Sequence, residues 1–528
     1  MKGNQAPAAE GNPQNSSGHS RLAVMADKFV AAVPAGMRTL MCCAVIIAVA
    51  FCVFVVNRAD PPHIFWDENY HVTSTERYLE GMMQFEPHPP LGLMMIAVGE
   101  YFSHANDGVD MHALVRTKEI NGDDMPANFS FAGMRLMPSL FAAFGALLFF
   151  ALIYELLENR LYALLFTSLY VFENAFVVHF RATHLDSFQM FFTLGSLWYF
   201  ARLWKSIEVL KWWQFALLAV WCALAMMVKV NAVFLVVLFP MLYIKDVKQH
   251  PKNSRTNWVA DAFTKGSSSL VAALAVFFMV FYVHALFSRN PPDANTPAGQ
   301  QDIANMSPRY REYIDKHEAL TPVMVYIIAR DYFHFMYKDH EGVPKLNPNN
   351  PGENGSYPWH WPFHDRNINY RWDSADGKTA YVQLVGNQLA WYCGTASVIL
   401  ALILVINYRI FAVLPRGSMR TYSMIEAFTL LYVAFMALNL WMISQRVLYL
   451  YHYFMGLAIS YALLTLMWKY LCEIHPRFNK HRLKILATTV SLFALSYWFF
   501  LPLTNHYPMT KAQCERRNIW VSHIVDCQ

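Results

Sequence analysis

Long runs of apolar residues, separated by short polar segments, recur along most of this 528-residue chain. A run of about 18 or more apolar residues with few charges is long enough to cross a bilayer as a helix. About eleven runs fit or approach this pattern, and the fourth to sixth are the shortest. They cover residues 39–57, 136–154, 161–178, 187–201, 213–228, 230–244, 268–287, 385–408, 427–445, 447–468 and 485–503. The pattern predicts an all-α polytopic membrane protein with about eleven transmembrane helices.

Basic residues gather in alternate connections between these runs. Lys and Arg favour cytoplasmic loops. With a cytoplasmic N-terminus, every basic cluster falls on the inner side: 202–211, 245–265, 409–420 and 469–484. The connection 155–160, which this topology also places inside, is neutral to acidic and gives the weakest support for it. This topology places the C-terminus outside.

The same topology divides the chain into five parts. Residues 1–37 are rich in Gly, Pro, Asn, Ser and Ala, which predicts a disordered cytoplasmic tail before a retained first span. Residues 38–287 form an N-terminal transmembrane module that includes the outer loop 58–135. Residues 288–384 form an outer loop domain with short helices near 308–317 and 322–335 and without clear strand alternation. Residues 385–503 are the C-terminal transmembrane helices, and 504–528 are an outer tail.

The composition excludes a soluble globular protein and a mostly disordered chain. Charged residues are 15% of the chain, against about 25% in a typical soluble protein. Aromatic residues reach 16%, which excludes disorder for most of the length. The net charge of +5 is modest and does not suggest a nucleic-acid partner. Cys514 and Cys527 lie in the outer tail, where they are either bonded or two separate thiols.

Two short motifs after the first span carry the candidate chemistry. Asp67 and Glu68 are adjacent carboxylates, bracketed by the interfacial aromatics Trp66 and Tyr70. About twenty residues later comes the rigid sequence HPPLG, which begins at His88. The following residues, 91–102, suit a helix that lies along the membrane interface. A solvated loop start would also explain an acidic pair, but this bracketing favours a site.

This arrangement resembles the protein O-mannosyltransferases, which are polytopic glycosyltransferases of the C-type fold that use lipid-phosphate sugar donors. Other elements of that family recur in order. They are FAGMRLMPSLFAAFG at 131–145, FRATHLDSFQMFF at 180–192, VKVNAV at 228–233, GSYPWHWPFHDRNINYRW at 355–372, VGNQLAW at 385–391 and RVLYLYHYF at 446–454. Departures include Leu93 after HPPLG, where the family has lysine. The outer loop 288–384 is too short for the β-trefoil domain of eukaryotic members, so the resemblance implies a bacterial-type enzyme.

The resemblance implies a function and a set of partners. The expected enzyme is an inverting glycosyltransferase that moves mannose from a polyprenyl-phosphate donor to Ser or Thr hydroxyls of exported proteins. Its partners would be membrane lipid, polyprenyl-phosphate-mannose and an exported protein or peptide. Its location would be the bacterial cytoplasmic (inner) membrane, with the active site on the outer (periplasmic) face.

Glycosyl transfer needs a base for the acceptor hydroxyl and positive groups for the departing phosphate. Asp67 is the candidate base, and Glu68 is expected to orient the acceptor or an arginine. Cations near the outer ends of spans would bind the donor phosphate, although each is also a typical snorkelling anchor. The candidate donor-binding residues are Arg135, Lys229, Asn231, Arg446 and His452. His452 would either donate to the phosphate or be a satisfied interfacial histidine.

Five further residues are expected to support the site: His88, Arg181, Asp186, Trp359 and His360. Asp186 has either a catalytic role or a structural one, as a helix cap or as the partner of Arg181. Trp359 and His360 are either a platform for the sugar or acceptor, or interfacial anchors.

No metal site or cofactor is predicted with support from the sequence. His360 and His364 have helical metal-ligand spacing, but Pro362 between them disfavours a regular helix. No nucleotide-binding fingerprint stands out, which agrees with a lipid-phosphate sugar donor. A divalent-ion requirement is left open.

Two alternatives stay open at this stage. A related transferase with a lipid or glycan acceptor, like the aminoarabinose transferases of lipid A, would share the acidic pair and the phosphate site. A transporter of a lipid-linked sugar would more often show paired repeats and broken helices near mid-membrane.

Overall fold

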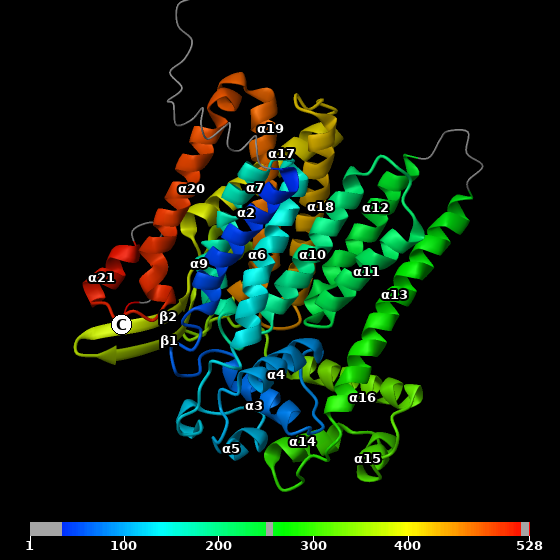
Figure 1. Cartoon of the computed structure of the whole chain (residues 1–528), viewed down its shortest axis with the longest axis vertical. Helices are drawn as coiled ribbons and strands as arrows, with labels where there is room; N and C mark the ends of the chain where they lie inside the picture. Colours follow the sequence, from blue (N-terminus) through cyan, green and yellow to red (C-terminus); the bar gives the residue numbers. More distant parts are fainter. Residues whose placement is uncertain (1–33, 250–256, 519–526, 528) are drawn as a thin grey trace, which may run out of the picture. The chain divides into compact units, whose positions relative to one another are not determined.

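The computed structural model describes residues 34–249, 257–518 and 527 (Figure 1). The chain divides into two compact units, Met1–Val45 and Ile46–Gln528. Except for residues 34–37, the predicted N-terminal tail lies outside the described residues. The first described helix, α2 (Ala35–Ala50), continues into one π-helical turn, η1 (Phe51–Val55). The apolar segment Gly36–Val55 is long enough to cross a membrane.

The remaining elements belong to the second unit. They are α3 (Glu68–Leu79), α4 (Leu91–Ser103), α5 (His112–Val115), η2 (Gly122–Asp124), α6 (Leu136–Leu157), α7 (Arg160–Phe166), α8 (Ser168–Val171), α9 (Asn174–Phe180), α10 (Asp186–Lys205), α11 (Trp212–Met226), η3 (Val230–Val237), α12 (Leu238–Val247), α13 (Trp258–Phe287), α14 (Pro297–Asn305), α15 (Pro308–Asp315), α16 (Pro322–Gly342), η4 (Pro358–Phe363), β1 (Ile368–Ala375), β2 (Lys378–Leu384), α17 (Gln388–Arg409), α18 (Met419–Met442), η5 (Leu450–Tyr453), α19 (Phe454–Ile474), α20 (Pro476–Thr504), α21 (Lys511–Glu515) and η6 (Arg516–Asn518).

The predicted spans form helices, but their count is lower than eleven. Within the described ranges, eight helices are long and apolar enough to cross a membrane. The predicted span 161–178 is broken, because α7 and α8 meet α9 at a bend of 60°, and counting this pair gives nine. The predicted span 213–228 corresponds to α11, whose 15 residues are short for a crossing. The span 187–201 lies in α10, which carries Asp186 and two basic residues in its last turn.

Helix α19 lies at the centre of the bundle. It packs against α17, α18, α6 and α20, and 14 of its 21 residues are buried. Helix α20, by contrast, buries few of its side chains. Both helices are strongly apolar, so their sequences alone do not distinguish the central helix from the peripheral one.

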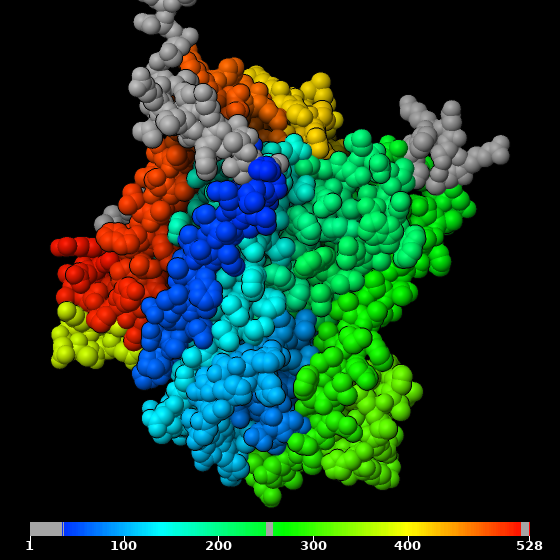
Figure 2. Space-filling view, viewed as in Figure 1, coloured from blue at the N-terminus to red at the C-terminus, as the bar shows by residue number. Residues whose placement is uncertain are grey.

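The outer loops 58–135 and 288–384 build one assembly beside the bundle. Figure 1 shows α3, α4 and α5 next to α14, α15 and α16, and Figure 2 shows their surfaces in contact. The backbone of Met83 donates to the carbonyl of Asn290 (2.9 Å). Buried Arg77 pairs with buried Asp302, and Lys118 Nζ donates to Asp302 Oδ1 (2.8 Å). These contacts fix the two loops to each other.

Helices α14, α15 and α16 begin with a Ser or Thr followed by Pro. Thr296, Ser307 and Thr321 are the N-caps, and each side chain accepts the backbone N–H three residues later. Proline is favoured at the first helical position because its missing N–H would have no intrahelical partner there. The predicted short helices 308–317 and 322–335 are therefore confirmed as α15 and α16.

The outer domain contains a hairpin that the lack of clear strand alternation in its sequence did not predict. β1 and β2 form an antiparallel hairpin, with a register irregularity between Asn369 and Arg371. Asp376 (φ 50°) and Gly377 (φ 70°) form its two-residue turn, and both are left-handed. Asp-Gly is a strong signal for this kind of tight hairpin turn. It was missed because alternation in β1 is weak: several of its side chains are partly or fully exposed.

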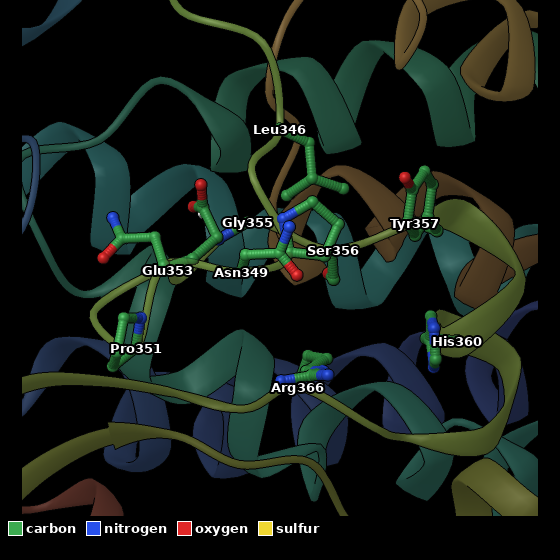
Figure 3. A pocket seen from close by; sticks show the side chains of 11 residues that line it. Leu346, Asn349, Pro351, Glu353, Gly355, Ser356, Tyr357, His360 and Arg366 are labelled. Atoms are coloured by element: carbon green, nitrogen blue, oxygen red, sulfur yellow. Dashed lines mark hydrogen bonds between the residues drawn. The ribbon is translucent and has the colours of Figure 1, made fainter.

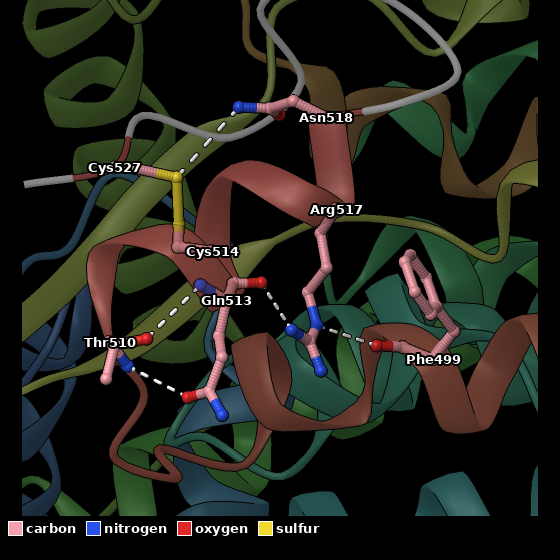
Figure 4. Close-up of a disulfide and its surroundings, with 7 residues drawn as sticks. All are labelled: Phe499, Thr510, Gln513, Cys514, Arg517, Asn518 and Cys527. Atoms are coloured by element: carbon pink, nitrogen blue, oxygen red, sulfur yellow. Dashed lines mark hydrogen bonds between the residues drawn. A yellow bond between two sulfur atoms is a disulfide. The ribbon is translucent and has the colours of Figure 1, made fainter.

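The C-terminal tail packs beside this hairpin. Thr379 of β2 and Met509 exchange backbone hydrogen bonds of 2.8 and 3.0 Å. Cys514 and Cys527 form a disulfide, and Cys514 joins an apolar cluster with Tyr381 of β2 (Figure 4). The first of the two alternatives for these cysteines, a bonded pair, is the one observed.

Candidate active site

A cavity of about 430 Å³ lies where the outer assembly meets the bundle. Most of its lining comes from five parts of the chain: the start of α3, the segment 85–88, the link between α11 and η3, the end of α16, and the segment from the end of α18 to η5. Leu93, Lys118 and Gln301 complete it. Among the predicted site residues, those on its wall are Asp67, His88, Lys229, Asn231, Arg446 and His452. Residues up to 385 positions apart in the sequence thus face one space.

Asp67 is the carboxylate at the start of α3. It occupies the N-cap position, follows Trp66 in a left-handed conformation (φ 52°), and is half-buried. The hydroxyl of Tyr451 donates to Asp67 Oδ2 at 3.4 Å. Burial raises the pKa of Asp67 above its usual value, while the charges of Lys229 and His179 act in the opposite direction. The group is therefore positioned on the cavity wall and is a better proton acceptor than a solvated aspartate.

Lys229 is held next to Asp67 by a buried carboxylate. Its Nζ donates to Asp186 Oδ2 at 2.7 Å and lies 5.4 Å from the centre of the Tyr451 ring. His179 Nε2 lies 2.9 Å from the same Asp186 oxygen. Asp186 itself does not line the cavity. It orients and partly neutralises the lysine, which explains how an ammonium group is accommodated beside buried groups.

Asn231, two residues further on, is fixed by α10. Gln189 Nε2 donates to Asn231 Oδ1 (2.6 Å) and to the carbonyl of Lys229 (3.0 Å). The link between α11 and η3 is thereby held open toward the cavity. The Asn231 amide group remains on the wall, where it suits a sugar hydroxyl or a phosphate oxygen.

Arg446 reaches the cavity from the end of α18. Its Nη1 lies 2.7 Å from Nδ1 of His340 on α16. Burial and the Arg446 charge lower the pKa of His340 to about 4, so His340 is neutral near pH 7 and accepts the hydrogen bond. The partner of Arg446 is therefore uncharged, and its guanidinium keeps its positive charge for an anion.

His88 and His452 line the cavity in different settings. His452 Nδ1 is 3.2 Å from the backbone nitrogen of Tyr449, whose carbonyl is also within 3.1 Å. This local contact orients the ring. Burial lowers the pKa of His88, so it is neutral near pH 7. The carbonyl of His88 accepts from the hydroxyl of Tyr332, which ties the HPPLG motif to α16.

Glu68 and Arg135 form a buried pair and do not line the cavity. Arg135 Nε and Nη2 donate to the two Glu68 oxygens at 2.8 and 2.7 Å. The other guanidinium hydrogens donate to backbone carbonyls, including those of Pro61 (2.8 Å) and His63 (2.9 Å). The assignment of Arg135 to the donor phosphate and of Glu68 to catalysis does not fit this geometry, because neither group has a donor or acceptor left for a ligand. The expectation that Glu68 orients an arginine does fit.

Three more predicted residues lie away from this cavity. Buried Arg181 donates to the carbonyl of Asn57 and to the side chain of Asn505, rather than to Asp186. Trp359 is 51% exposed and stacks on Tyr357. His360 lines a second cavity and pairs with Asp365 (2.8 Å). A direct platform for the sugar at the first cavity does not follow from these positions.

Other residues of the site were not singled out from the sequence. Tyr451 and His179 contact Asp67 and Asp186, and Lys118 and Glu86 line the far end of the cavity. Tyr451 stands within the quoted segment 446–454, and His179 directly precedes the segment 180–192. Their position beside family motifs was the available signal. Lys118 had no such signal in the sequence, because it pairs with Asp302 of a distant loop.

Within residues 34–249, 257–518 and 527, no group of three or more His, Cys, Asp or Glu side chains is placed to hold a metal ion. His364 is fully buried, and its Nε2 accepts the backbone N–H of Gly386 at 2.7 Å. His360 points to Asp365 instead, so these two histidines do not converge.

Comparisons with known proteins cover most of the chain. A family model described as dolichyl-phosphate-mannose-protein mannosyltransferase matches residues 44–287. A second, described as the C-terminal four TMM region of protein-O-mannosyltransferase, matches residues 331–523. Dolichyl-phosphate-mannose–protein mannosyltransferase 3 of Saccharomyces cerevisiae is 24% identical over 247 residues, which is 45% of this chain and 32% of that protein. Protein O-mannosyl-transferase 2 of Danio rerio is 30% identical over 141 residues, 26% of this chain and 17% of that one.

The chain thus matches about a third or less of the length of these curated relatives. One solved structure matches nearly the whole length. It is that of the S. cerevisiae protein O-mannosyltransferase Pmt1-Pmt2 complex bound to the sugar donor, with a TM-score of 0.72, 14% identity and 93% of each chain covered. This likeness shows a shared fold.

Proposed function

Because this chain belongs to the protein O-mannosyltransferase family, we propose that it transfers mannose from a polyprenyl-phosphate donor to Ser or Thr hydroxyls of exported proteins. The chain is a multi-pass membrane protein of the C-type glycosyltransferase fold. The observation that carries the proposal is the first cavity, where Asp67 faces the same space as Lys229 and Arg446. A base and two phosphate-binding cations are the groups that this transfer requires.

The proposed reaction is one displacement with inversion. The acceptor oxygen attacks the anomeric carbon of mannose, the bond from that carbon to the phosphate oxygen breaks, and polyprenyl phosphate leaves. Asp67 accepts the hydroxyl proton late, as the new C–O bond makes that proton acidic. The Tyr451 hydroxyl, which donates to Asp67 Oδ2, fixes the carboxylate for this step.

The departing phosphate would gain negative charge at the opposite side of the reaction centre. Arg446 suits two phosphate oxygens, because its guanidinium presents a planar fork. Lys229 supplies a point charge, and the Asp186 carboxylate holds its ammonium group in place. In this proposal Asp186 and His179 are positioning residues, since they act through Lys229.

The proposed location is the bacterial cytoplasmic membrane, with the N-terminus inside and the cavity on the outer face. The distribution of Lys and Arg in the short connections supports this orientation. So does the position of the cavity beside the two large loops, 58–135 and 288–384, which the same topology assigns to the outside.

The experiment uses the full chain in nanodiscs, radiolabelled polyprenyl-phosphate-mannose and Ser/Thr-rich peptides. Wild type should label peptide, and Asp67→Asn should lower the rate by about 10²-fold or more with donor binding retained. Asp123→Asn, an exposed aspartate of the same outer loop, is the matched control and should leave the rate unchanged. Label that reaches lipid but not peptide would replace the protein acceptor by a lipid one. An unchanged rate in folded Asp67→Asn would remove Asp67 as the base.

A further inference from the structure

A second cavity of about 340 Å³, lined by both polar and apolar groups, lies in the outer loop domain. Its wall is the loop from Leu346 to Tyr357, together with His360 and Arg366. Figure 3 shows Arg366 and His360 across an open gap from the part of the loop that carries Asn349 and Ser356. The lining is rich in side-chain amide and hydroxyl groups. A polar ligand therefore fits this cavity, unlike the largely apolar one between α11, α12 and α13.

The two cavities share a structural wall. The backbone N–H of Ser356 donates to the carbonyl of Leu448 at 2.8 Å. A Cβ on Gly355 would come within 2.2 Å of Val447, so only glycine permits this close approach. Residues Arg446 and Tyr449, on either side of this contact, line the first cavity. Residues that line the second cavity therefore contact the segment 446–449, which also borders the first cavity.

The wall of the second cavity is preformed. The two Glu353 oxygens accept the backbone N–H groups of Gly355 (2.7 Å) and Asn347 (3.3 Å), which fixes the loop. Opposite, Arg366 has a left-handed backbone (φ 68°) and an exposed side chain. Non-glycine residues seldom adopt this conformation, and strained positions of this kind concentrate at ligand sites.

Arg366 is the one permanently cationic side chain among the described lining residues. Within the described residues only the backbone N–H of Arg366 donates a hydrogen bond, so the five guanidinium donors remain for a ligand. The Glu353 carboxylate on the same wall repels an anionic phosphate headgroup. A sugar platform is also disfavoured, because Tyr357 is stacked on Trp359 at 4.3 Å between ring centroids. The groups suit backbone carbonyls and polar side chains of an extended polypeptide.

We propose that this second cavity is an exosite that binds the acceptor polypeptide beside the hydroxyl to be glycosylated. The inference rests on the proposed function, since it names where that acceptor is held. An acceptor bound there would extend past the segment 446–449 into the first cavity, at about 3.4 Å per residue. A long acceptor would contact both cavities and a short one only the first, so the long acceptor would bind more tightly although the catalytic centre is the same.

The test compares acceptor peptides of two lengths, one limited to the Ser/Thr core and one with flanking residues on both sides. Arg366→Ala should raise the KM of the long peptide about tenfold, the equivalent of a charge-assisted hydrogen bond. The KM of the donor, the kcat and the KM of the short peptide should not change. Asn349→Ala should act in the same direction. Arg116→Ala, an exposed arginine next to α5, is the matched control.

A binding measurement keeps the inference separate from the proposed function. Fluorescence anisotropy of the labelled long peptide, without donor, should show weaker binding to Arg366→Ala than to wild type. Equal affinities and equal KM values overturn the exosite while peptide labelling by wild type upholds the function. If peptide binding depends on Arg366 but no peptide is labelled, the peptide-binding site is upheld and the proposed function is overturned. A change in donor KM in Arg366→Ala also overturns the exosite, since the cavity would then belong to the donor site.

Discussion

Replacing Arg135 by alanine tests whether this arginine stabilises the fold or binds the donor. The substitution removes two hydrogen bonds to Glu68 and leaves backbone carbonyls in the segment 58–63 without their donor. It also leaves the Glu68 carboxylate buried with only backbone donors, the N–H groups of Phe65 and Thr183. Removing one partner of a buried ion pair typically costs about 3–5 kcal/mol. That is a large fraction of the stability of a folded protein, which is about 5–15 kcal/mol.

The assay is thermal unfolding in detergent, combined with the donor KM of the fraction that remains folded. Arg135→Ala should lower the unfolding midpoint strongly and leave the donor KM unchanged. Arg135→Lys should recover only part of the loss, because an ammonium group lacks the planar fork that serves Glu68 and the carbonyls together. Arg116→Ala, an exposed arginine of the same loop, should leave the midpoint unchanged.

A double-mutant cycle adds a second readout. Glu68→Gln, Arg135→Met and the double variant should show a coupling energy of about 0.5–3 kcal/mol, as expected for residues in contact. The reasoning would be refuted by an Arg135→Ala protein with a normal midpoint and a raised donor KM. That result would return Arg135 to the phosphate site, as the sequence resemblance implies.

Two further predictions concern Lys229 and His340, which both line the first cavity. Lys229→Ala should raise the donor KM at least tenfold, while Lys229→Arg should recover part of the affinity, as measured by donor titration at saturating peptide. The pKa of His340 is about 4 in the folded protein against an ordinary 6.5, so between these values the unfolded chain binds a proton that the folded chain does not. Stability should therefore fall as the pH drops from 6.5 toward 4, and His340→Gln should show a smaller decrease of its unfolding midpoint between pH 7 and pH 5. An equal decrease in both proteins would exclude His340 as the source.

The sequence predicts elements whose signals are local. Two short helices of the outer loop domain were predicted and are α15 and α16, and most of the spans follow from apolar length. The bend between α8 and α9 was not predicted, although Glu173 and Asn174 interrupt the apolar run 161–178 at that point. Glu173, the N-cap of α9, accepts the backbone N–H of Asn387 at 2.7 Å. A contact across more than two hundred residues leaves no local pattern.

Some of the site residues could be predicted from local motifs, while the role of others depends on tertiary contacts. Asp67 and Lys229 were predicted from motifs, and the structure brings both to one cavity. Arg135 was grouped with them because a lone arginine near the outer end of a span looks alike whether it faces a ligand or a carboxylate. Whether Arg135 can bind a ligand depends on how many hydrogen-bond acceptors of the protein surround its guanidinium. The carbonyls of residues 58–63 become such acceptors only in the folded chain. Hydrogen-bond saturation is a tertiary property.

The hydrogen bond from Tyr451 to Asp67 also has a consequence for the order in which the protein becomes functional during synthesis. Its two partners are 384 residues apart, and Lys229 enters between them. While a ribosome is still extending the chain, Asp67 emerges early, without the tyrosine that orients it and without the lysine that would meet a phosphate. A half-made chain therefore carries the carboxylate but not the site. In the proposed mechanism, the site is complete only when the segment that leads into α19 has been made and inserted, so a shorter chain would lack the tyrosine that orients Asp67.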